Sequence, residues 1–368
     1  MKKILLYIDV MTRGGAQRVM ANISDFLCKS GYKVLLLTDQ PPKNPEIEYP
    51  INRNIRRIYL ENGKGNRIRR QVMRAVRLRR VLKREKPDIA LSFLRGPNLR
   101  LLLCGLGLGA KTVVSVRSDP RMEYRGILLK GIAKFLFSCA DGVVFQTEEA
   151  ALFFQKSVRT KAAIIPNPVK DTYYQVCRAD WNSQDIIAVG RLTEEKRPLL
   201  LLSAFARIAN CFPQARLILY GKGDLQEQLE QEAAALKLGH RVLLPGEVED
   251  VPQRLSQAGI YVLCSDWEGM PNALMEAMAT GLPVIATDCP CGGPRFLIRD
   301  QTQGILTKCG DEAGLAAALK TLLSDPELRR SMGEAARERA KAFHEDIVMN
   351  HWIAYLEKTS GEINAAQY

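Results

Sequence analysis

One segment of the chain combines acidic side chains with the start of a helix, and its residue types suit chemistry best. Within residues 265–287, Glu268 lies in a loop and seven residues separate it from Glu276. The sequence predicts a helix that opens near Pro271 and ends at Gly281, because proline favours the first turn and glycine the residue after the last. The free N–H groups at the helix start attract an anion, and the carboxylates accept hydrogen bonds from hydroxyls. A ligand with both a diphosphate and hydroxyls fits these groups.

Two cations follow another predicted strand. Arg191 and Lys196 are suited to hold a diphosphate, and fixed cations aimed at a departing phosphate lower the barrier to its release. The simpler alternative is that both are surface ion-pair partners of Glu194 and Glu195. We choose Arg191 and Lys196 as catalytic candidates.

Glycines lie at two further strand ends. They are Gly14, Gly15, Gly221 and Gly223. Such glycines allow a backbone to approach a phosphate, but they also relax tight turns. Because no complete G-x-G-x-x-G is present, a dinucleotide site is poorly supported.

The elements that must position these residues alternate between strand and helix in both halves of the chain. The predicted strands are short apolar runs, which are typical of buried parallel strands. Strands are predicted over 3–10, 32–38, 89–93, 112–116 and 142–145, and then over 186–189, 216–220, 242–244, 260–264, 283–286 and 304–307. The chain ends in predicted helices over 312–323, 326–343 and 345–358.

These elements predict two Rossmann-like α/β domains with a helical C-terminus. The pattern breaks around Pro166, Asn167 and Pro168. We therefore expect a first domain over 1–170, a second over 171–343, and a C-terminal helix over 344–368 that returns to the first domain. Because open α/β sheets bind ligands beyond the carboxyl ends of their strands, the chemistry is expected in a cleft between the two domains.

Four segments, in order along the chain, carry a resemblance to a known family. They are Gly14-Gly15-Ala16, Val189-Gly190-Arg191-Leu192 with Lys196, Tyr220-Gly221-Lys222-Gly223, and Glu268-Gly269-Met270-Pro271 with Glu276. With these segments the chain resembles, over nearly its whole length, the retaining family-four glycosyltransferases, which have the GT-B fold.

The resemblance implies an enzyme that moves a hexose or N-acetylhexosamine from a nucleotide sugar to a lipid-linked glycan of bacterial surface-polysaccharide assembly. Among nucleotide sugars, a UDP sugar is the expected donor. The first domain would bind this acceptor and the second the donor. The donor-binding residues would be Gly15, Arg191, Lys196, Gly221, Glu268, Gly269, Met270, Pro271, Asn272 and Glu276. Within this set Glu276 would bind the ribose, Glu268 and residues 269–272 the sugar, and Arg191 and Lys196 the diphosphate.

The resemblance also implies a mechanism. Arg191, Lys196 and Glu268 would be catalytic, configuration would be retained, and a leaving phosphate oxygen would take the acceptor's proton. Many relatives have a histidine after the fourth N-terminal strand, where this chain has Arg117 and Asp119. These two residues, with Gly14, are expected to contact the sugar or acceptor. No Asp-x-Asp occurs, so no bound metal or other cofactor is expected.

Charge is distributed unevenly along the chain. Residues 1–170 contain 33 Lys and Arg against 13 Asp and Glu, and residues 171–368 contain 20 against 27, so the halves carry +20 and −7. Residues 64–86 alone hold eleven Lys and Arg and one acid, Glu85, on a predicted helix. We expect Ile68, Val72, Ala75 and Leu82 to pack on the domain while the arginines face outward.

Such a basic helix favours an anionic membrane surface. The simpler alternative is a solvated helix. Nucleic acid is not expected, because few aromatic residues interleave with the arginines.

Other classes of protein fit the sequence less well. Nine scattered cysteines indicate reduced thiols, and the longest apolar candidate, residues 101–110, is about half of what a membrane span needs. We therefore expect a cytoplasmic protein held peripherally at the inner face of the cell membrane. Two alternatives stay open: a nucleotide-sugar epimerase of the same fold, and a non-catalytic protein that binds an anionic membrane or nucleic acid.

Overall fold

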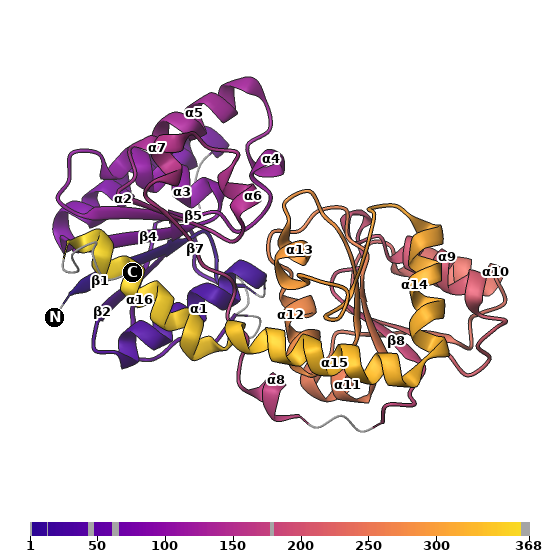
Figure 1. Cartoon of the computed structure of the whole chain (residues 1–368). Coiled ribbons are helices and arrows are strands. Elements are labelled where there is room, and N and C mark those ends of the chain that lie inside the picture. The colour runs from indigo at the N-terminus through magenta and orange to yellow at the C-terminus, as the bar shows by residue number, and fades with distance from the viewer. Residues whose placement is uncertain (1, 13, 43–47, 61–65, 177–179, 362–368) are drawn as a thin grey trace. The chain divides into compact units, whose positions relative to one another are not determined.

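The computed structural model describes residues 2–12, 14–42, 48–60, 66–176 and 180–361. The chain divides into two compact units, the first made of Met1–Asn167 with Asp346–Tyr368 and the second of Pro168–Glu345. Each unit is a parallel sheet with helices on both faces, as Figure 1 shows. The prediction of two Rossmann-like folds is confirmed.

The first unit is built on a seven-stranded sheet in the order β3-β2-β1-β4-β5-β6-β7. Every neighbouring pair in it is parallel. The strands are β1 Lys3–Ile8, β2 Lys33–Thr38, β3 Arg56–Tyr59, β4 Ile89–Phe93, β5 Lys111–Ser115, β6 Gly142–Phe145 and β7 Ala162–Ile164. The central strands are almost wholly buried, which explains their apolar sequences.

Two layers of helices cover this sheet. The helices are α1 Gly15–Lys29, α2 Arg67–Glu85, α3 Arg95–Gly105, α4 Pro120–Glu123, α5 Ile127–Ser138, α6 Glu148–Ala151, α7 Lys156–Arg159 and α16 Glu345–Ser360. Figure 1 shows α2, α3 and α5 on one face of the sheet and α1 and α16 on the other. Helix α3 packs between α2 and α5.

Helix α16 is built into the first unit although it ends the chain. The Trp352 ring lies 5.7 Å from the Phe93 ring of β4. The Tyr355 hydroxyl accepts a 2.7 Å hydrogen bond from the Val143 backbone N–H and donates a 2.6 Å bond to the Lys161 carbonyl. The helix is therefore tied to strand β6 and to the residue that precedes β7.

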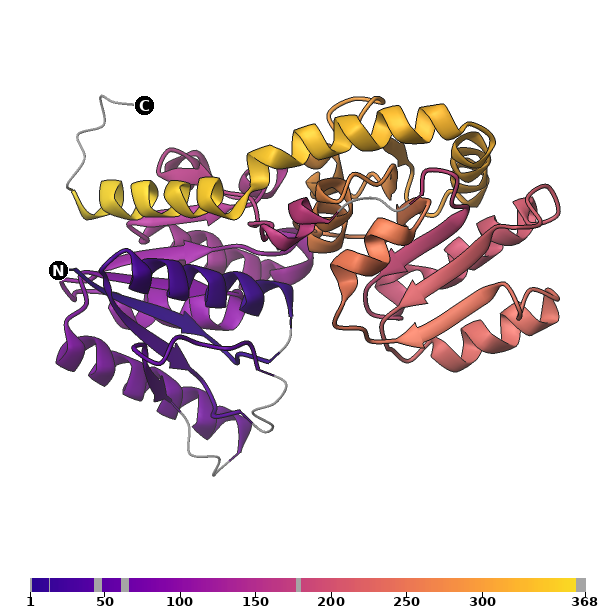
Figure 2. The same cartoon turned by 90° about the horizontal axis from the view of Figure 1, so that it is seen from below.

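The second unit has a six-stranded parallel sheet in the order β10-β9-β8-β11-β12-β13. Its strands are β8 Asp185–Val189, β9 Arg216–Tyr220, β10 Val242–Gly246, β11 Ile260–Leu263, β12 Val284–Thr287 and β13 Ile305–Thr307. Its helices are α8 Thr172–Gln175, η2 Glu194–Lys196, α9 Pro198–Ile208, α10 Gln226–Ala235, α11 Val251–Gln257, α12 Asn272–Ala279, α13 Gly293–Leu297, α14 Glu312–Ser324, α15 Pro326–Ala340 and η3 Lys341–Phe343. Helices α9 and α14 share the core on one face, and α12 and α15 the core on the other (Figure 2).

For the first half of the basic helix, α2, the predicted packing on the domain is wrong. Ile68 and Val72 of α2 are exposed rather than packed on the domain, whereas Leu82 is buried as expected. Some arginines turn inward instead: Arg74 pairs with the buried Asp39 at 3.1 Å, and Arg77 donates to the Leu60 carbonyl at 2.8 Å. Residue Lys64 lies outside the described residues. Within the described part of the chain, none of the helices has the length and apolar character that a membrane crossing requires.

Candidate active site

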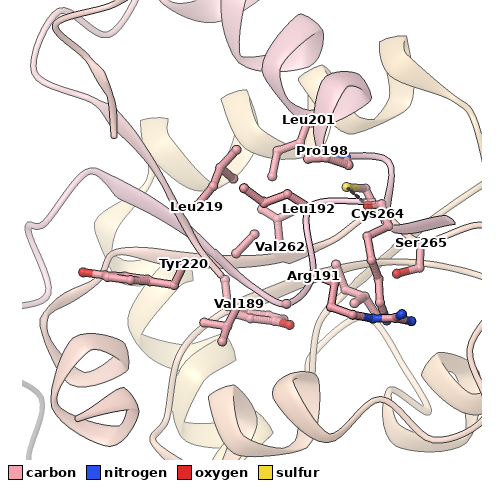
Figure 3. Close-up of a pocket in the computed structure, with 15 residues that line it drawn as sticks. Val189, Arg191, Leu192, Pro198, Leu201, Leu219, Tyr220, Val262, Cys264 and Ser265 are labelled. Atoms are coloured by element: carbon pink, nitrogen blue, oxygen red, sulfur yellow. Dashed lines mark hydrogen bonds between the residues drawn. The ribbon is translucent and has the colours of Figure 1, made fainter. Parts of the chain in front are cut away.

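The strand order of the second unit reverses between β8 and β11. Strands β9 and β10 extend the sheet to one side of β8, while β11, β12 and β13 extend it to the other. Loops that leave two such neighbouring strands turn to opposite faces and open a crevice at the carboxyl edge. A pocket lies at this point, lined by residues 188–192 and 261–265 together with Lys196 (Figure 3). Thus the predicted cations and the acidic loop lie at one sheet edge.

The ammonium of Lys196 pairs with the carboxylate of Glu268, although the two residues are 72 positions apart. Lys196 closes the short helix η2 after β8, and Glu268 lies in the loop after β11. The same carboxylate oxygen accepts a 2.8 Å hydrogen bond from the Ser265 hydroxyl. The two side chains are 25% and 13% exposed, so the pair is partly shielded from water and still open to a ligand.

The loops that carry this pair are joined by two further contacts. The Asp266 backbone N–H donates to the Glu195 carbonyl at 2.9 Å, and the Arg197 guanidinium bonds to the Asp266 carboxylate at 2.7 Å. Below them the Cys264 thiol donates to the Lys196 carbonyl at 3.2 Å. The loop after β8 and the loop after β11 are therefore joined beside the Lys196–Glu268 pair.

Arg191 stands apart from this pair. Its guanidinium bonds to the Glu195 carboxylate at 2.8 Å, and its side chain is 72% exposed. The ion-pair alternative named above is thus realised for Arg191 and not for Lys196. Burial opposes ionisation of Glu195, but its hydrogen bonds and the charges of Arg191 and Lys196 outweigh burial and lower its pKa. Figure 3 shows Arg191 beside the pocket, where an exposed guanidinium is able to move to a ligand.

Gly221 and Gly223 have a structural explanation. The loop after β9 passes so close to the loop after β8 that a Cβ on Gly221 would lie 1.9 Å from the Gly190 carbonyl oxygen. A Cβ on Gly223 would lie 2.2 Å from the Leu192 carbonyl oxygen. Gly221 also has a φ of +132°, a conformation that side chains rarely adopt. Contact between Gly221 and a donor stays a prediction.

The loop from Gly269 to Asn272 leads into α12. This helix begins and ends close to Pro271 and Gly281, as the sequence predicted. Pro271 is its N-terminal cap, and Gly281 follows its last turn with a φ of +80°. A Cβ on Gly293 would lie 1.8 Å from the Gly269 carbonyl oxygen. The start of α13 therefore fixes the backbone that the resemblance assigns to the sugar, while Met270 is buried in the core.

Glu276 lies on α12 and is only 5% exposed. Its charge and that of Glu268 both act on the Tyr261 hydroxyl of β11, whose pKa is raised well above its usual value, mainly by burial and then by these carboxylates. Within the described part of the chain, the Tyr261 hydroxyl has no hydrogen-bond partner. The two predicted acidic residues thus lie near the same strand.

The predicted residues of the first unit have roles within that unit. Gly14 caps α1, which starts at Gly15, in an extended conformation. The buried Arg117 donates to the Asn167 side chain, its guanidinium lies 4.8 Å from the centre of the Phe93 ring, and burial lowers its pKa to about 9. Asp119 caps α4 through a 2.8 Å bond from the Arg121 N–H. A sugar or acceptor contact at these residues stays a prediction.

Sequence reasoning missed Ser265 and Gly293. The hydroxyl of Ser265 orients Glu268, and Gly293 holds the loop beside it. Gly293 belongs to a Gly-Gly-Pro run after β12, so the rule that marked the other strand-end glycines would have found it. Among the described residues, no group of three His, Cys, Asp or Glu side chains is placed to hold a metal ion. Metal independence stays a prediction.

Comparison with known families matches both halves of the chain. Residues 13–173 match the family described as Glycosyltransferase Family 4. Residues 170–339 match the family described as Glycosyl transferases group 1, and this range contains every donor-site candidate except Gly15.

Two curated relatives come from Campylobacter jejuni. One is named GalNAc-alpha-(1->4)-GalNAc-alpha-(1->3)-diNAcBac-PP-undecaprenol alpha-1,4-N-acetyl-D-galactosaminyltransferase; it is 24% identical over 96% of this chain and 98% of its own length. The other is named N-acetylgalactosamine-N,N'-diacetylbacillosaminyl-diphospho-undecaprenol 4-alpha-N-acetylgalactosaminyltransferase; it is 26% identical over 97% of this chain and 100% of its own.

Among solved structures, the Anabaena protein HepE in complex with UDP has a TM-score of 0.83 at 18% identity, over 97% of this chain and 100% of its own. The likeness confirms the predicted GT-B fold.

Proposed function

Because the chain belongs to the glycosyltransferases, to Family 4 in its first half and group 1 in its second, we propose that it moves a hexose or N-acetylhexosamine from a UDP sugar to a lipid-linked glycan. The observation that carries the proposal is the Lys196–Glu268 pair at the reversal of strand order between β8 and β11. A cation and a carboxylate at one sheet edge suit a ligand that joins a diphosphate to a sugar.

In this site each group has a distinct task. The Lys196 ammonium, held by two loops, stabilises the negative charge that grows on the leaving diphosphate. Arg191 adds a second, more mobile cation after leaving Glu195. Glu268 accepts hydrogen bonds from sugar hydroxyls through the lone pairs that Lys196 and Ser265 do not use, and Glu276 accepts bonds from the ribose.

The chemical step exchanges one bond for another. The bond between the anomeric carbon and the diphosphate oxygen breaks as a bond to the acceptor hydroxyl oxygen forms on the same face of the sugar. The leaving phosphate oxygen accepts the proton of that hydroxyl, so configuration is retained without a separate base. The cations in the site are side chains, and no metal is required.

Support for the acceptor comes from the two Campylobacter relatives, whose names specify sugars linked through diphosphate to undecaprenol. Support for the donor comes from HepE, a protein of the same fold solved with UDP. A lipid-linked acceptor places the enzyme at a membrane surface, and the strongly basic first half of the chain suits an anionic one. We therefore propose peripheral association with the inner face of the cell membrane.

A two-stage assay tests the proposal. Melting temperature is first measured with a panel of nucleotide sugars, and product is then sought with a lipid-diphosphate sugar, its anomeric configuration being determined by NMR. The proposal predicts a shift with UDP sugars and a retained configuration. Release of free sugar without acceptor would instead favour an epimerase, and no nucleotide-sugar affinity would favour a non-catalytic binding protein.

A further inference from the structure

The outer side of the α2, α3 and α5 layer exposes large apolar side chains. Helix α2 presents Ile68, Val72 and Val76, and helix α5 presents Leu128, Ile132 and Phe135. The residues of each set are spaced by three or four, so each forms one stripe along its helix. Their exposure runs from 38% at Val76 to 78% at Leu128. Single exposed apolar residues are ordinary on a protein surface, whereas grouped ones mark an interaction site.

The two stripes belong to one surface. Helix α3 packs against both α2 and α5, and its exposed Leu103 lies on the helix between the stripes. Both stripes point away from the sheet, because the opposite sides of these helices carry buried residues such as Val81 of α2 and Phe137 of α5. Figure 1 shows the three helices side by side on one face of the first unit. We call the two stripes and Leu103 the apolar face.

Basic residues border the apolar face. Arg69, Arg80 and Lys83 are exposed on α2, on or next to the side that carries its stripe. Helices α3 and α5 contain no acidic residue, and the only acid of α2 is Glu85, which pairs with Arg56 at 3.3 Å. The border is therefore positive without interspersed negative charge.

From this combination we infer that the apolar face lies in the headgroup layer of an anionic bilayer. Its stripes would reach the boundary of the acyl chains, while Arg69, Arg80 and Lys83 meet lipid phosphates. Exposed apolar residues beside cations are the pattern of a protein that lies on a membrane. A second copy of the chain is a poorer occupant, because a face-to-face pair would bring two positive borders together.

The inference deepens the proposed function. It rests on that proposal only because a lipid-linked acceptor requires the protein to reach a membrane. It changes the expected contact from a basic helix alone to a mixed surface on two helices. The exposed position of Ile68 and Val72, which contradicts the sequence prediction, is then part of the binding surface.

Vesicle flotation tests the inference with the full chain, without donor or acceptor. The probes are phosphatidylcholine vesicles with and without phosphatidylglycerol. The double variant Leu128→Ser, Phe135→Ser is compared with Leu236→Ser, a matched control because Leu236 is an exposed leucine of the second unit. The double variant should lose at least about tenfold in affinity for anionic vesicles, since apolar burial and headgroup attraction act together, while the control binds as the unaltered chain does. Lys83→Glu should weaken binding most at low salt.

Insertion is measured separately with the Phe135→Trp variant, whose fluorescence at the substituted position should be quenched by brominated lipid. Undiminished vesicle binding by the double variant, or indole fluorescence at position 135 that brominated lipid leaves unchanged, would overturn the inference. So would a protein that ignores vesicles but forms a dimer that the double variant abolishes. Because these exposed substitutions should leave the melting temperature unchanged, a lower one would identify misfolding, in which case the quenching experiment decides. Transfer to a water-soluble acceptor should persist in the double variant, so failure of membrane docking and failure of the proposed function are distinguishable.

Discussion

Replacing Lys196 by methionine separates the role of its charge from its role in the fold. The substitution removes the ammonium and keeps an unbranched side chain. In the unliganded protein it breaks the pair with Glu268, whose carboxylate keeps the 2.8 Å bond from Ser265. Because the Lys196 side chain is 25% exposed, we expect the free energy of unfolding to fall by about 1 kcal/mol, near the upper end for exposed pairs.

The effect on turnover should be much larger. Removing one group that stabilises developing negative charge costs about 2.7–4 kcal/mol, so kcat should fall by roughly 10²–10³. The matched control is Arg197→Met, which removes the neighbouring cation and its 2.7 Å bond to Asp266 from the same loop. Its side chain is directed to Asp266 rather than Glu268, so its kcat should stay within about fivefold, the effect of 1 kcal/mol.

Steady-state kinetics and thermal unfolding of both variants provide the measurement. If Lys196→Met and Arg197→Met lose activity equally, or if Lys196→Met keeps nearly full kcat while folded, the assignment of the ammonium to the leaving group is refuted.

Three further outcomes follow from individual contacts. Gly221→Ala should lower the free energy of unfolding, measured by denaturant titration, by about 3 kcal/mol, because its Cβ would meet the Gly190 carbonyl. The control is Gly239→Ala, where a Cβ meets nothing within 4 Å, and this variant should unfold like the parent. Burial raises the pKa of Glu123 to about 7, so the folded state loses stability as pH rises from the unfolded pKa through 7. Glu123→Gln should therefore gain on the order of 1–3 kcal/mol relative to the parent between pH 5 and pH 8, and an equal difference at both pH values would contradict this. Glu276→Gln should weaken nucleotide binding by about tenfold in calorimetry with little change in melting temperature, because the amide keeps the volume of the buried carboxyl and loses its charge; unchanged affinity would remove Glu276 from the site.

Local patterns predicted most of the fold. The buried strands β1 and β11 are apolar apart from Lys3 at the start of β1, and the helix that follows β11 is bounded by Pro271 and Gly281. Two edge strands were missed for a physical reason. Strand β3 reads Arg-Arg-Ile-Tyr and β7 has three residues, so neither shows the apolar run of a strand buried on both faces.

Long-range contacts could not be predicted in the same way. The Lys196–Glu268 pair joins two loops that are far apart in sequence. They meet only because β8 and β11 are neighbouring strands in the sheet. The inward turn of Arg74 depends on Asp39, which lies 35 residues earlier, directly after β2. Helical periodicity finds the apolar stripe of α2 but not whether protein or another partner covers it.

The central claim is that the edge between β8 and β11 binds a nucleoside diphosphate through Lys196. Calorimetry tests it most directly, with whichever of UDP, GDP and ADP raises the melting temperature most, measured against its parent nucleoside. The unaltered protein should bind the diphosphate much more tightly than the nucleoside, and Lys196→Met should lose most of that difference while binding the nucleoside normally. The same difference in Lys196→Met, or no diphosphate preference in the unaltered protein, would contradict the account.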